Sequence, residues 1–123
     1  MDISQLDVRT KPSVKEGLVL NQSASADITV VDYQPGNGTR YFLSIVDTSA
    51  LSDEVNSMLG FGSGKGGWIV TDLNVHRSMQ LNSDGFISSE YVAEKMGCFE
   101  SDACVLAELF GELLGREHDK AGP

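Results

Sequence analysis

The sequence has few of the residues that define several protein classes. Its 123 residues include two cysteines, three prolines and one tryptophan. Two cysteines cannot build the multiple-disulfide framework that is typical of small secreted domains. No apolar run approaches the roughly 20 residues of a membrane-spanning helix, and residues 1–5 lack the basic start of a secretory signal. We therefore expect a cytoplasmic location and no membrane contact.

Basic residues are also scarce. Nine Lys and Arg stand against 18 Asp and Glu, which gives a net charge of -9. Phosphate backbones would be repelled by such a chain, so we expect no direct binding of nucleic acid. A basic protein partner would be attracted instead, and its approach accelerated. Solubility alone would also explain the same charge.

Motifs for metal binding and catalysis are missing. His76 and His118 have no second histidine or cysteine at zinc-like spacing, and five residues rather than two to four separate Cys98 from Cys104. No nucleophile elbow is present. We predict no enzyme, no cofactor and no metal site. His76 is expected at a strand end or on the surface, and the cysteines are expected to act as small apolar residues.

A glycine-rich segment invites a nucleotide-binding interpretation, which its context contradicts. Gly62, Gly64 and Gly67 form a GxGxxG string, but it follows a predicted helix and precedes a strand, the reverse of the phosphate-binding order. A Walker-type loop fails because Leu59 and Gly66 occupy the places of its first glycine and its Ser or Thr. We predict a recognition loop whose partner-binding residues are Gly62, Ser63, Gly64 and Lys65.

The strongest structural signal is a hairpin at residues 27–47. Two β-branched and aromatic runs flank the segment 34–39, in which Asn37 and Gly38 readily supply the positive φ angles of tight turns. Residues 68–75 have the composition of a third strand.

The first predicted helix follows the hairpin. Ser52 can cap it, Asp53 and Glu54 suit its first turn, and Gly60 can end it. Its apolar residues fall on one face, and they are Leu51, Val55, Met58 and Leu59.

Two more helices are predicted in the last third of the chain. Ser88 can cap a helix that reaches Met96, with Gly97 as its stop. Residues 101–115 form a longer helix with an apolar stripe opposite its glutamates. These helices need an apolar surface to cover, and the sheet provides one.

The predicted fold class is α+β, with a small antiparallel sheet, hairpin 27–47 plus strand 68–75, packed against two or three helices. We predict a single domain over residues 1–123. Residues 1–26 are expected to be a loosely ordered N-terminal arm with at most one short strand.

The segment from Gln80 to Tyr91 resembles the calcium-binding loop of the EF-hand family. Asn82 and Asp84 stand at the third and fifth ligand positions, and Gly85 stands at the turn. Gln80 replaces the first aspartate and Tyr91 the closing glutamate, so much of the negative charge is missing. The resemblance implies a calcium-binding module as an alternative function. An Asp-Gly turn before a helix explains the same residues without a metal.

Acidic residues are concentrated late in the chain, where nine stand against three basic ones from Asp84 onward. Glu90 and Glu94, like Glu108 and Glu112, are four residues apart, so each pair lies on one helical face at a cost of like-charge repulsion. We predict that these four residues form a docking surface for Lys and Arg. A solvated face without a partner is the alternative.

Three segments, 39–47, 55–60 and 66–70, are similar to a strand, helix and strand arrangement in small uncharacterised phage-encoded proteins. They lie within residues 39–70 of the 123. The glycine- and methionine-rich stretch of that family is replaced here by residues 72–77. The resemblance implies origin on a mobile element and no enzymatic activity.

Together these observations predict a small acidic protein-interaction domain without enzymatic activity. We expect an inhibitor that covers the basic, nucleic-acid-binding surface of a partner in the cytoplasm of a host cell. In size and charge the chain resembles phage inhibitors of host defence, including anti-CRISPR proteins.

Overall fold

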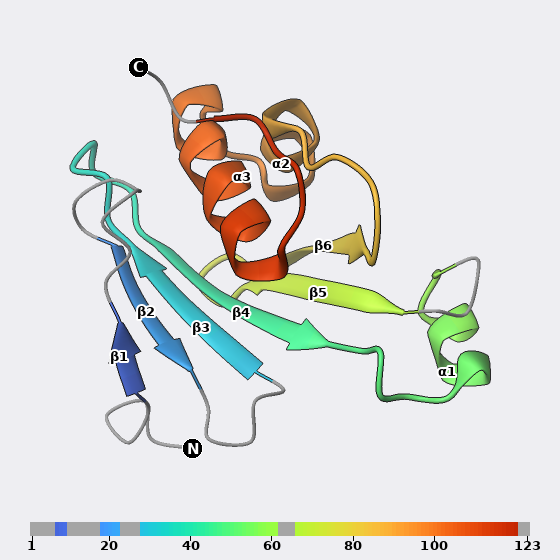
Figure 1. The fold of residues 1–123 in the computed structure, drawn as a ribbon. Helices are drawn as coiled ribbons and strands as arrows, with labels where there is room; N and C mark the ends of the chain where they lie inside the picture. The colour runs from blue at the N-terminus through green and yellow to red at the C-terminus, as the bar shows by residue number, and fades with distance from the viewer. Residues whose placement is uncertain (1–6, 10–17, 23–27, 62–65, 121–123) are drawn as a thin grey trace.

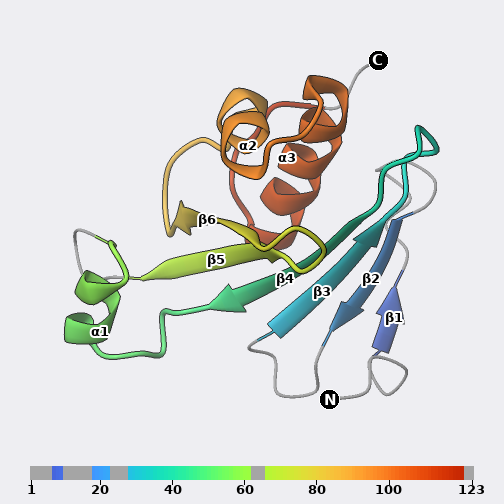
Figure 2. The same ribbon diagram turned by 180° about the vertical axis from the view of Figure 1, so that it is seen from behind.

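The computed structural model describes residues 7–9, 18–22, 28–61 and 66–120. The described strands form one antiparallel sheet in the order β1-β2-β3-β4-β5-β6, and α2 and α3 cover one of its faces (Figure 1, Figure 2). The predicted α+β class is confirmed. The elements are β1 (Asp7–Arg9), β2 (Leu18–Gln22), β3 (Ile28–Tyr33), β4 (Tyr41–Asp47), α1 (Asp53–Met58), β5 (Gly67–Asp72), β6 (Arg77–Asn82), α2 (Ser89–Met96) and α3 (Glu100–Leu114).

The predicted hairpin is the pair β3 and β4, in which Ile28 lies opposite Val46 and Tyr33 opposite Tyr41. Its connection is longer than a tight turn, and Gly38 has a positive φ whereas Asn37 does not. The side chain of Asn37 instead binds across the molecule, as described below.

The third predicted strand is shorter than expected and is followed by one that the sequence did not predict. β5 ends at Asp72, whose Oδ1 accepts a hydrogen bond from the backbone of Asn74 (2.9 Å), and the chain turns at residues 73–76. It returns as β6, where the buried Met79 and Leu81 alternate with polar residues that are exposed or half-buried. The N-terminal arm also supplies two strands, β1 and β2, rather than at most one.

The helix ends follow the predicted capping residues. Ser52 accepts from the backbone of Val55 (3.2 Å), and Ser88 accepts from that of Tyr91 (3.0 Å). Gly97 closes α2 in the left-handed conformation that favours glycine, at φ 66°. Within the described ranges, no helix is long and apolar enough to cross a membrane.

The core lies between the sheet and the two C-terminal helices. It is built from the inward residues of β3 to β6 together with the buried faces of α2 and α3. Its largest fully buried members include Phe110, Leu106, Leu109, Leu43 and Ile87. Burial of such side chains stabilises the fold by roughly 1.5–3 kcal/mol each.

The apolar face predicted for the first helix is not part of this core. α1 projects from the ends of β4 and β5, away from α2 and α3 (Figure 1). Leu51, Val55 and Met58 are therefore 45%, 39% and 80% exposed. The buried residue of α1 is polar: Asn56 donates to the backbone carbonyl of Thr48 (3.0 Å) and to those of two neighbours.

Candidate functional site

The four predicted partner-binding glutamates all lie in the helical layer. Glu90 and Glu94 are exposed one turn apart on α2, and Glu112 is exposed on α3, where Glu108 is half-buried. Because α2 packs against α3, both pairs lie on the same side of the sheet (Figure 1). Glu108 and Glu112 also interact with other groups of the chain. The α2 pair is thus the simpler one to test.

Basic side chains near this layer make contacts within the chain. The Lys95 ammonium lies 5.9 Å from the centre of the Tyr91 ring. Arg77 donates through Nε to the carbonyl oxygen of Lys95 (3.4 Å), at the C-terminal end of α2. Arg116 donates hydrogen bonds to backbone carbonyls of the turn at residues 82–85. These contacts give the three basic side chains partners within the chain, although Lys95 and Arg77 are exposed, as are Glu90 and Glu94.

The Arg116 guanidinium fills the turn at residues 82–85. It donates to the carbonyl oxygens of Asn82 (2.5 Å), Asp84 (2.7 Å) and Gly85 (3.0 Å). Burial lowers the pKa of Arg116, and Asp84 partly offsets this. One cation of the chain thus satisfies three backbone acceptors.

This arrangement does not fit a calcium loop. The side chain of Gln80, at the first ligand position, donates to the carbonyl of Leu59, and Tyr91, at the last position, donates to the carbonyl of Gln80 (2.7 Å). Backbone oxygens of the loop receive Arg116 instead. In the described part of the chain, no group of three His, Cys, Asp or Glu residues is placed to hold a metal ion.

Asp102 does not belong to the acidic surface, because it is only 3% exposed. Its carboxylate accepts from the Tyr41 hydroxyl (2.6 Å) and from Nδ2 of Asn37 (3.1 and 3.2 Å). Tyr33 stacks on Tyr41 with ring centres 6.0 Å apart. Burial and the hydrogen bond to Asp102 raise the pKa of Tyr41. Sequence reasoning missed this network because its partners are more than 60 residues apart in the chain.

A second buried carboxylate, that of Asp72, lines a pocket of about 440 Å³. The pocket lies between the start of β4, the turn after β5 and the connection from α2 to α3. Asp72 is 4% exposed, whereas Val75 and Phe99 at the rim are 58% and 62% exposed. Burial, and then the charges of Asp102 and Asp72, raise the pKa of the Cys98 thiol to about 11. The pocket therefore holds a buried carboxylate, has exposed apolar side chains at its rim, and is also lined by Arg40.

The remaining sequence candidates lie elsewhere. Cys98 and Cys104 are free, as expected. His76 is exposed in the turn after β5, with a positive φ of 59°, and does not line the Asp72 pocket.

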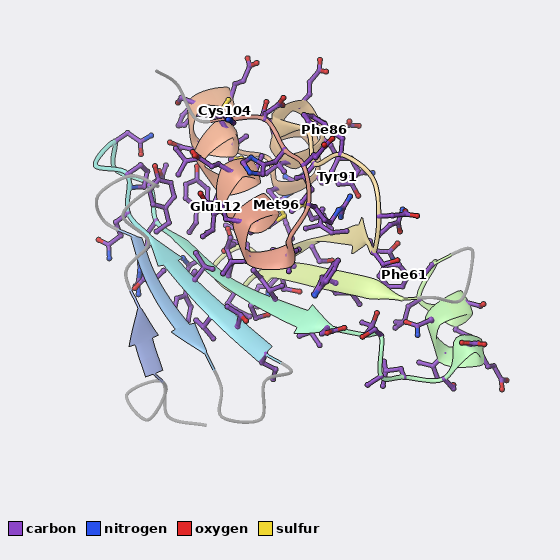
Figure 3. The ribbon with its side chains drawn as sticks, viewed as in Figure 1. Phe61, Phe86, Tyr91, Met96, Cys104 and Glu112 are labelled. Atoms are coloured by element: carbon purple, nitrogen blue, oxygen red, sulfur yellow. The ribbon has the colours of Figure 1, made fainter. Side chains whose placement is uncertain are left out.

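The predicted partner-binding residues Gly62, Ser63, Gly64 and Lys65 lie outside the described residues. Phe61, just before them, is buried at the α1 end of β5, far from Met96 in the helical layer (Figure 3). Gly67 begins β5, and a Cβ there would collide with the carbonyl oxygen of Leu81, so this position requires glycine.

An exposed aromatic residue lies close to the acidic residues of α3. Phe86 is 56% exposed and lines an open groove with Glu112, Glu117 and Lys120. Aromatic residues beside charged ones are typical anchors of protein interfaces. The sequence pattern did not predict this exposure, since an apolar residue between a turn and a helix is equally suited to a core.

Comparison with known proteins yields no relative. No protein-family model, no curated protein and no solved structure matches the chain.

Proposed function

We propose that this chain is a protein-interaction domain that binds a basic partner through the acidic surface of α2 and α3. The observation that carries the proposal is the arrangement of charge in the helical layer. Glu90 and Glu94 are exposed one turn apart on α2, while Lys95, Arg77 and Arg116 make contacts with other groups of the chain.

Such a surface favours a partner rich in Lys and Arg. A field of one sign steers an oppositely charged protein during diffusion and repels partners of like charge. The exposed Phe86 would supply an apolar anchor, because charged pairs at an exposed rim contribute little affinity by themselves.

The proposed effect on the partner is occlusion. Proteins that hold nucleic acid expose Lys and Arg to neutralise phosphates, and the same groups can bind carboxylates instead. We propose that the domain is an inhibitor that competes with nucleic acid for its partner, in the manner of a phage-encoded anti-defence protein such as an anti-CRISPR.

The test compares two variants of equal charge. Glu90→Lys with Glu94→Lys reverses two exposed charges on α2, and Asp53→Lys with Glu54→Lys reverses two on the distant α1. Each tagged variant and the wild type would be used to capture proteins from a lysate of the organism that carries the gene. Mass spectrometry would then identify the captured proteins. A specific partner should be lost from the α2 variant and retained by the α1 variant.

The captured protein would then be purified and mixed with fluorescently labelled nucleic acid. The wild-type domain should displace that nucleic acid, and the α2 variant should not. Equal capture by both variants, or a partner that retains its nucleic acid, would contradict the proposal.

A further inference from the structure

We propose that the Asp72 pocket binds an arginine side chain of the basic partner, an inference that rests on the proposed function for the source of that side chain. The pocket lies where β4, the turn after β5 and the α2–α3 connection meet. Its interior carries a carboxylate and its walls are largely apolar, the combination that a guanidinium on an alkyl stem requires.

The charge of Asp72 has no ionic partner among the described residues. Within the described part of the chain, its carboxylate accepts a hydrogen bond from the backbone N–H of Asn74. A buried carboxylate is costly unless a cation or several donors compensate it. The pocket gives a cation from outside access to this group.

Arg40 is among the residues that line the pocket and Arg77 is the partner of Asp72 in the β5–β6 pair, but each binds another group. Arg40 forms a two-pronged salt bridge with Asp32 (2.9 and 3.0 Å). Arg77 lies opposite Asp72 across the β5–β6 pair, yet it donates to the carbonyl of Lys95. Neither forms a salt bridge with Asp72.

The rest of the lining favours arginine over lysine. Phe99 and Met96 provide an aromatic and a polarisable surface on which a planar guanidinium can stack. Tyr41 and Cys98 add polar atoms at the wall. A lysine ammonium is more strongly hydrated and gains less from such walls.

The test uses a blocked arginine as the probe. Nα-acetyl-arginine methylamide would be titrated into the full chain while amide chemical shifts are followed by NMR. Saturable shifts are expected at residues 72–76 and 97–99. The lysine analogue should bind more weakly, and the uncharged citrulline analogue should not bind.

Two variants test the named contacts. Asp72→Asn keeps the Oδ1 acceptor for the backbone N–H of Asn74 but removes the negative charge. It should lower the affinity for the arginine probe at least about tenfold. Phe99→Ala removes an exposed aromatic ring and should lower the affinity for the probe about threefold. Thermal melting would verify that both variants fold.

Three results would overturn the pocket assignment: equal binding of citrulline, equal binding by Asp72→Asn, or shifts that spread over α2 without saturating. None of these outcomes depends on Glu90 or Glu94. If charge reversal on α2 leaves partner capture unchanged while the pocket still binds the probe, the proposed function fails and the pocket assignment stands.

Discussion

Two oxygen-rich sites in the same molecule differ in the source of their donors. At the turn of residues 82–85, Arg116 of the chain itself occupies the site and satisfies three carbonyl oxygens. The residues of that turn are exposed, whereas Asp72 is only 4% exposed and its carboxylate accepts one backbone N–H. The first site is complete within the chain, and the second has room for a group from outside. The comparison teaches that the donors within the chain, and not the exposure of the oxygen atoms, decide which oxygens are left for a group from outside.

The largest effect is expected at the carboxylate that the chain satisfies itself. Asp102→Asn would place an amide NH₂ group opposite the Nδ2 donor of Asn37, and it would weaken the hydrogen bond from the Tyr41 hydroxyl. The free energy of unfolding should therefore fall by about 2 kcal/mol. Asp72→Asn should not lower the free energy of unfolding, because the charge that it removes is buried without an ionic partner among the described residues. Urea denaturation of both variants measures the difference. Equal losses would remove the distinction between the two sites.

A smaller effect is expected at the turn. Arg116→Met removes the donor of three exposed carbonyl oxygens, which water can partly replace, so the loss should be about 1 kcal/mol. Lys120→Met, at an exposed position of the same segment, should cost less than about 0.5 kcal/mol. Calcium should not raise the melting temperature of the wild type. Stabilisation by millimolar calcium would revive the calcium-binding alternative.

The smallest expected effect is a shift in the pKa of the Cys98 thiol. In a Cys104→Ser background, its alkylation rate should rise with pH toward a pKa of about 11. Asp102→Asn should lower this pKa more than Asp72→Asn does, because each removes a negative charge that disfavours the thiolate and Asp102 acts more strongly. The rate of iodoacetamide reaction against pH measures both shifts. An ordinary pKa in the wild type would show that the pocket wall is neither dry nor acidic.

Local signals in the sequence predicted local structure well. Ser52, Ser88 and Gly97 cap helices as their types and positions indicated. The hairpin and the α+β class followed from periodicity and turn residues. β6 was missed because its apolar residues, Met79 and Leu81, alternate with polar ones over too short a run to separate from a loop.

The candidate site was predicted only in part. The spacing of the glutamates placed each pair on one helical face, but nothing local marked Asp102 as buried rather than exposed. The contacts of Asp102 with Tyr41 and of Arg116 with Asn82 join residues far apart in the chain. Such contacts depend on the packing of helices on the sheet, which sequence spacing does not specify.

The central claim is that outward carboxylates on the helical layer guide and hold a basic protein. Its most direct test is the association rate with the captured partner, measured by stopped flow at increasing salt. Wild type and the α1 variant, Asp53→Lys with Glu54→Lys, should associate fast at low salt and slow down steeply as salt rises. The α2 variant, Glu90→Lys with Glu94→Lys, should be slow and nearly insensitive to salt. Identical salt dependence for all three proteins would contradict the account.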